Sequence, residues 1–92
     1  MLYPVAIDKG DSSFGVCLPD IPGCFSGGDD YQDAIESVRE AIEAHIELLV
    51  EDGESVPEAT TVENWLSDPE YAGAVWALVD VDITRLMGKA EK

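Results

Sequence analysis

The stretch Phe14-Gly-Val-Cys-Leu-Pro-Asp-Ile-Pro-Gly-Cys-Phe-Ser-Gly-Gly-Asp-Asp-Tyr-Gln-Asp33 contains the signals of a strand, a turn and a helix start. Apolar residues alternate with other residues along Phe14–Leu18, the pattern of a strand with one buried face. Pro19 and Pro22 lack a backbone donor, so the strand ends there. Because glycine accepts a positive φ, the pair Pro22-Gly23 predicts a tight turn.

A short strand and a long helix follow this turn. Cys24–Ser26 predicts the strand, Gly27-Gly28 ends it, and Asp29 or Asp30 caps the helix. From Asp30 to about Asp52, apolar side chains recur every three or four residues and form one stripe. At about 1.5 Å per residue the helix spans about 30 Å, so we expect it to lie across one face of a sheet. The stripe consists of Ala34, Ile35, Val38, Ala41, Ile42, His45, Ile46 and Leu49.

The flanking segments complete a small mixed fold. Leu2–Asp8 predicts a first strand that forms a hairpin with the strand at Phe14–Leu18. Thr60 and Glu63 have capping-box spacing, which predicts a short helix from Val62 to about Ser67. Ala74–Val81 predicts a last strand, either central or an edge covered by a partner, because both of its faces are apolar. The order is β-β-β-α-(α)-β, an α+β two-layer sandwich with the helix on one sheet face.

Length and composition limit the number of domains and the location of the protein. The 92 residues make one domain, and 46% of them are hydrophobic. We assign the domain to residues 1–82 and interpret residues 83–92, a weak helical turn with a polar end, as a linker. No apolar run approaches the ~20 residues that span a bilayer, and no signal peptide is visible. We therefore expect no membrane association and a cytoplasmic protein.

The charge balance bears on the class of partner. Twenty acidic residues against five basic ones give a net charge of −15. This charge argues against binding of a nucleic-acid backbone by this segment and favours a basic partner, although acidity also serves solubility. Cys17 and Cys24 are expected to be reduced. With His45, a residue expected at the core edge, they supply too few ligands for a metal site, so no cofactor or metal is expected.

An enzymatic alternative stays open at this point. Asp8, Asp80 and Asp82 lie at ends of predicted strands, and Glu43 or Glu47 lies on the long helix. If these carboxylates converged, they would hold the divalent metal of a nuclease or hydrolase. Acidic residues are so abundant here that coincidence also explains their placement. We therefore expect no catalytic residues in this chain and keep a metal-dependent nuclease as the alternative.

Several segments together resemble the HicB antitoxins of bacterial and archaeal toxin–antitoxin pairs. They are Tyr3-Pro4-Val5, Leu18-Pro19-Asp20-Ile21-Pro22-Gly23-Cys24 followed by Gly28-Asp29, and Glu51-Asp52-Gly53-Glu54 with Pro57. The segment from Glu70 to Val79 resembles the longer branch of that family. The resemblance implies a fold related to a degenerate RNase H without nuclease activity. It also implies binding to HicA, a small basic mRNA interferase whose active site the antitoxin covers.

The same resemblance bears on assembly and on DNA. Full-length members continue into a ribbon-helix-helix or helix-turn-helix domain that binds their own promoter, which makes them probable autorepressors. This chain ends at Lys92, so we expect no DNA binding from the 92-residue segment. A homodimer or higher oligomer is expected, because a small sheet leaves an edge strand open.

Five residues are candidates for toxin binding. Asp20, Phe25 and Asp29 flank the turn and the glycine pair, where the backbone is exposed and rigid. Trp65 and Tyr71 are aromatic residues of the kind that anchor interfaces. Each also has a structural alternative: Asp20 orders the turn, Asp29 caps the helix, and the aromatic side chains belong to the core.

Overall fold

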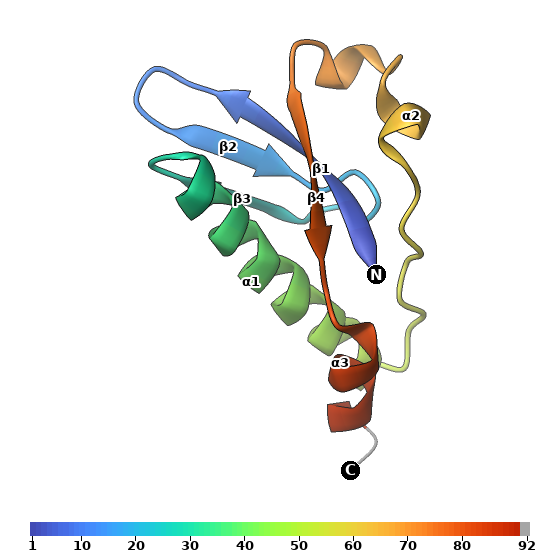
Figure 1. Cartoon of the computed structure of the whole chain (residues 1–92). Coiled ribbons are helices and arrows are strands. Elements are labelled where there is room, and N and C mark those ends of the chain that lie inside the picture. Colours follow the sequence, from blue (N-terminus) through green and yellow to red (C-terminus); the bar gives the residue numbers. More distant parts are fainter. Residues whose placement is uncertain (91–92) are drawn as a thin grey trace.

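The computed structural model describes residues 1–90, with side chains through Leu86 (Figure 1). The expected α+β two-layer sandwich is confirmed: one long helix covers one face of a four-stranded antiparallel sheet. The elements are β1 (Leu2–Lys9), β2 (Phe14–Cys17), β3 (Phe25–Gly28), α1 (Tyr31–Glu51), α2 (Val62–Trp65), the 3-10 turn η1 (Pro69–Tyr71), β4 (Val75–Asp80) and α3 (Ile83–Ala90).

The strand order is β3-β2-β1-β4, so β1 lies in the interior of the sheet and β4 at an edge. Leu2 pairs with Asp80 and Ile7 with Val75, which brings the two ends of the sequence together. Of the two positions expected for the last strand, central or covered edge, the structure has the edge. Its outer face is partly covered by the chain's own residues 60–73, between α2 and the start of β4 (Figure 1).

α1 supplies most of the core, as its stripe predicts. Asp30 is the N-cap, and its carboxylate accepts a hydrogen bond from the Asp33 amide at 2.8 Å. One side chain per turn is fully buried against the sheet, whereas His45 and Leu49, at the margins of the stripe, are only half-buried. The buried helix residues are Ala34, Val38, Ile42 and Ile46, and they form one cluster with Tyr3, Val5, Ile7, Val16 and Val79.

Two local expectations are wrong. Gly27-Gly28 does not end β3 but lies within it. A Cβ on Gly28 would come 2.4 Å from the Ala34 backbone nitrogen, so Gly28 allows α1 to pack closely on the strand. A Cβ on Gly27 would come 2.8 Å from the Phe14 carbonyl oxygen of the neighbouring strand β2. Thr60 does not cap α2, because the N-cap is Thr61 and makes no side-chain capping bond.

The C-terminal segment is more ordered than its sequence suggests. Where a weak turn was expected from Ile83, the structure has α3, and Leu86 is buried in the common core. Arg85 also pairs with Glu43 of α1 at 3.0 Å. The assignment of a domain boundary after residue 82 stays a prediction, and the last two residues of the expected linker, 91 and 92, lie outside the described residues. Within residues 1–90, no helix has the length and apolar content needed to cross a bilayer.

Candidate partner-binding face

The sheet face opposite α1 carries the candidate site. Alternation along the strands places Ala6, Cys17, Phe25 and Trp76 in one row across all four strands of this outer face. Ala6 is buried, whereas the Phe25 side chain at the β3 edge is 68% exposed. Since residues 60–73 cover the middle of the row, the open parts of this face are its two edges.

Asp20 fastens the covering segment to the turn after β2. Its carboxylate accepts hydrogen bonds from the Thr60 amide at 2.7 Å and the Thr60 hydroxyl at 2.7 Å. The Trp65 indole N–H donates to the same carboxylate at 3.1 Å. Asp20, one of the predicted toxin-binding residues, therefore makes its side-chain hydrogen bonds within the chain. These bonds join the Pro-Gly turn to α2.

Three aromatic side chains, Trp65, Tyr71 and Trp76, form a row from the Asp20 hydrogen bonds toward the β4 edge. The Trp65 and Tyr71 rings meet edge to face with centroids 6.0 Å apart, and Tyr71 meets Trp76 at 5.7 Å. Burial of its hydroxyl, followed by the influence of Cys17 and Glu70, raises the pKa of Tyr71 to about 12. Burial also raises the pKa of the Cys17 thiol, although the hydrogen bond with Tyr71 opposes that shift. Ionisation of Tyr71 therefore requires a more alkaline pH than ionisation of a free tyrosine does.

Phe25 and Tyr71 border one hollow. Its volume is about 330 Å³, and Cys17, Pro22 and Glu70 also line it. Cys17 and Cys24 are both free thiols: Cys17 lies in this hollow and Cys24 in the core. The hollow adjoins the turn whose shape Asp20 fixes.

Four of the five predicted residues thus lie around the same turn and covering segment, and Asp29 lies apart. Asp29 precedes the N-cap of α1, and its amide donates to Asp33 at 2.9 Å. Its exposed carboxylate makes no hydrogen bond or ion pair with another described residue. Of the two residues considered for capping, Asp30 performs it, so the side chain of Asp29 is available to a partner.

The sequence did not predict a second exposed groove, which lies at the β4 edge. Leu2 and Leu78 are 52% and 56% exposed and line a groove of about 360 Å³ with Thr60–Glu63. The alternation of Leu2–Ala6 and of Trp76–Asp80 places these leucines on the second face of their strands. Only the pairing of β1 with β4 brings them together.

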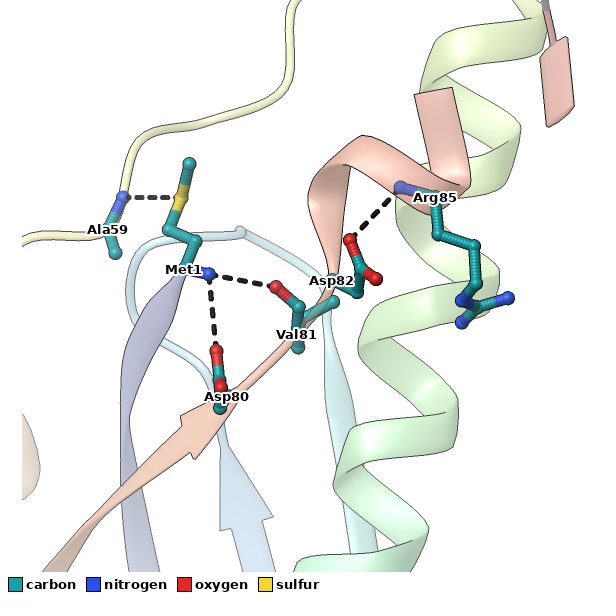
Figure 2. A network of polar contacts seen from close by, with 6 residues as sticks. All are labelled: Met1, Ala59, Asp80, Val81, Asp82 and Arg85. Carbon is teal, nitrogen blue, oxygen red and sulfur yellow. Dashed lines mark hydrogen bonds and ion pairs between the residues drawn. The ribbon is translucent and has the colours of Figure 1, made fainter. Parts of the chain in front are cut away.

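The carboxylates considered for a nuclease do not converge. Asp8 and Asp80 lie at opposite ends of β1, since Asp8 pairs with Gly15 and Leu2 with Asp80. Asp80 accepts from the Met1 amine at 3.2 Å, and the Asp82 carboxylate accepts from the Arg85 amide at 3.0 Å (Figure 2). Among the described residues, no three His, Cys, Asp or Glu side chains are grouped to hold a metal ion.

Comparison with known proteins finds a matching family and similar solved structures. Residues 3–92 match the family model of the HicB-like antitoxin of bacterial toxin–antitoxin systems. The N-terminal domain of the Burkholderia pseudomallei antitoxin HicB is 52% identical, with a TM-score of 0.80 over 89% of this chain and 99% of that domain. A chain of the HicA3–HicB3 toxin–antitoxin complex is 32% identical, with a TM-score of 0.76 over 89% of this chain and 99% of that one. An uncharacterized 14.9 kDa protein of Haemophilus phage HP1 is 47% identical over all 92 residues, which cover 69% of its length.

Proposed function

The chain belongs to the family of HicB-like antitoxins, and from this membership we propose that it binds a small basic RNase of the HicA type and neutralises it by covering the active site. The observation that carries the proposal is the charge: a net −15 on 92 residues suits a basic partner. A related chain in a HicA3–HicB3 complex supports a toxin of this class. The dispersed carboxylates favour a binding role over the metal-dependent nuclease.

Complementary charge acts mainly on the rate of encounter. Because attraction between exposed charges is screened within about 8 Å at physiological ionic strength, added salt should slow association more than it speeds dissociation. Desolvated side chains should supply most of the binding energy. Phe25 and Asp29 are exposed and so are contact candidates. Asp20, Trp65 and Tyr71 contribute by shaping the face as well as through any direct contact.

The test is RNA cleavage by the cognate toxin, titrated with this chain. We expect inhibition that saturates at a fixed molar ratio, and no RNA cleavage by this chain alone with Mg²⁺ or Mn²⁺. Phe25→Ala and Asp29→Ala should weaken inhibition without lowering the melting temperature by more than a few degrees. Undiminished cleavage at micromolar excess of the folded chain would refute the proposal.

Two further proposals concern repression of transcription and self-assembly. We infer that a full-length form represses its own promoter, and that the 92-residue chain does not bind DNA, since its described basic side chains are few and scattered. A gel shift with promoter DNA in physiological salt checks this. We also propose a homodimer or higher oligomer, because β3 and β4 each lack a second strand neighbour among the described residues. Sedimentation velocity measures it.

A further inference from the structure

The groove between β4 and α2 has the features of a docking surface. Leu2 and Leu78 are diagonal neighbours on the outer face, because Leu2 pairs with Asp80 and Pro4 with Leu78. Pro4, on the same face, is buried, yet both leucines are more than half exposed. Val62 of α2 lines the opposite side of the groove, which measures about 360 Å³. The groove has room for one apolar side chain of a partner.

The adjacent strand edge lacks two of the usual protections. Natural sheets shield edge strands with charged side chains, prolines or bulges, because a bare edge pairs with other chains. In β4, the sequence Val75-Trp-Ala-Leu-Val79 contains neither a charged side chain nor a proline, and Val75 is 49% exposed. No described strand pairs with the free side of β4. The groove and this free edge adjoin, and together they form one strip along β4.

The charges around this strip select the occupant. Glu63 lines the groove, and Asp80, whose carboxylate also pairs with the Met1 amine at 3.2 Å, follows Leu78 on the same face. The described basic side chains lie elsewhere: Lys9 at the far end of β1, Arg39 on α1, and Arg85 on α3, where it pairs with Glu43. A second copy would bring another −15 chain against this acidic rim. A partner with an apolar anchor surrounded by Lys or Arg is complementary to it.

We propose that the basic toxin docks here, with an apolar side chain between Leu2 and Leu78 and cationic side chains facing Glu63 and Asp80. This inference rests on the proposed function and specifies its surface. It places the main anchors at the β4 edge rather than at Phe25, on the opposite edge of the sheet. A homodimer, where it forms, then uses a different surface.

The experiment measures toxin affinity by titration calorimetry, using chains without an N-terminal tag because the Met1 amine binds Asp80 and Val81 beside the groove (Figure 2). The test variant is the double substitution Leu2→Gln with Leu78→Gln. The matched control is Leu48→Gln, since Leu48 is 60% exposed on α1. All three positions are exposed, so we expect each variant to remain folded. The double variant should bind about 30-fold more weakly, the loss typical of an interface anchor, and the control within about twofold of wild type.

Three other outcomes would each contradict the inference, and the measurements distinguish them. If the double variant binds as wild type does, the groove is not the docking surface, although the proposed function stands. If wild type itself fails to bind or inhibit the toxin, the proposed function fails first and the inference with it. If the substitutions dissociate a wild-type dimer in sedimentation velocity while toxin affinity is unchanged, the occupant is a second copy.

Discussion

Replacing Asp20 by alanine should loosen the segment that covers the outer sheet face. The Asp20 carboxylate accepts three hydrogen bonds, two from Thr60 and one from Trp65, and all of them join residues at least 40 positions apart in the sequence. Among the described residues, no other side-chain hydrogen bond links the turn after β2 to α2. We therefore expect Asp20→Ala to release α2 and Trp65 from the turn.

The size of the effect follows from these contacts. A hydrogen bond contributes about 0.5–1.5 kcal/mol net, and the two bonds from Thr60 are exposed to solvent, so we expect a loss of about 2–3 kcal/mol for the three. In a domain of this size that loss lowers the melting temperature by about 10–20 °C. Asp20→Asn retains one oxygen but turns an NH2 group toward a donor, so it should cost about 1–2 kcal/mol.

Urea unfolding followed by tryptophan fluorescence measures these losses, and iodide quenching reports the release of Trp65. Asp29→Ala is the control, because it removes the same charge from a side chain without a described partner. The control should stay within about 0.5 kcal/mol of wild type. If Asp20→Ala were as stable as this control, the carboxylate would not fasten the covering segment.

Three further predictions test the core, the close packing of Gly28 against α1 and the raised pKa of Tyr71. Ile42→Ala should cost about 2–5 kcal/mol in urea unfolding, and Leu49→Ala clearly less because Leu49 is half-buried; equal losses would contradict the burial pattern. Gly28→Ala should cost about 1–3 kcal/mol by pushing the start of α1 from β3, whereas Gly15→Ala, with no atom near its Cβ, is the tolerated control; similar midpoints would refute the contact. The raised pKa of Tyr71, about 12, means that the folded state holds a proton that the unfolded chain loses near pH 10. Stability should therefore fall as the pH rises from about 10 to 12, and less steeply in Tyr71→Phe, which alkaline melting curves measure.

The elements with a strong local signal were predictable from sequence. The 3.6-residue stripe of α1 and the alternation of β1 and β4 reflect burial of one face, and a single sequence displays that directly. The glycine pair at the end of β3 was misread as a strand break, because a break and a close approach of neighbouring backbone, from α1 at Gly28 and from β2 at Gly27, both favour glycine. Leu86 was missed because Ile83, Leu86 and Met87 span little more than one helical turn, which is too short for a repeat that reveals a helix face.

The site depended on contacts that no local pattern contains. The sequence marks Asp20 as a turn residue, but its partners Thr60 and Trp65 are set by the path of the chain after α1. Leu2 and Leu78 each look like ordinary strand residues, and only the antiparallel register makes them neighbours. The basic partner stays a prediction, because it rests on the net charge of −15 and on no contact in the structure.

The position of β1 between β2 and β4 has a consequence for synthesis of the chain. Ile7 pairs with Val75, so the first strand emerges from the ribosome about 70 residues before its last neighbour. At 5–20 residues per second, this interval lasts roughly 4–15 s. Throughout it, the nascent chain presents the β4-facing side of β1 as an unpaired edge, open to chaperones and to other nascent strands. A message truncated before the codon for Val75 therefore yields a chain that cannot complete its sheet, even though α1 and more than three quarters of the residues have been made.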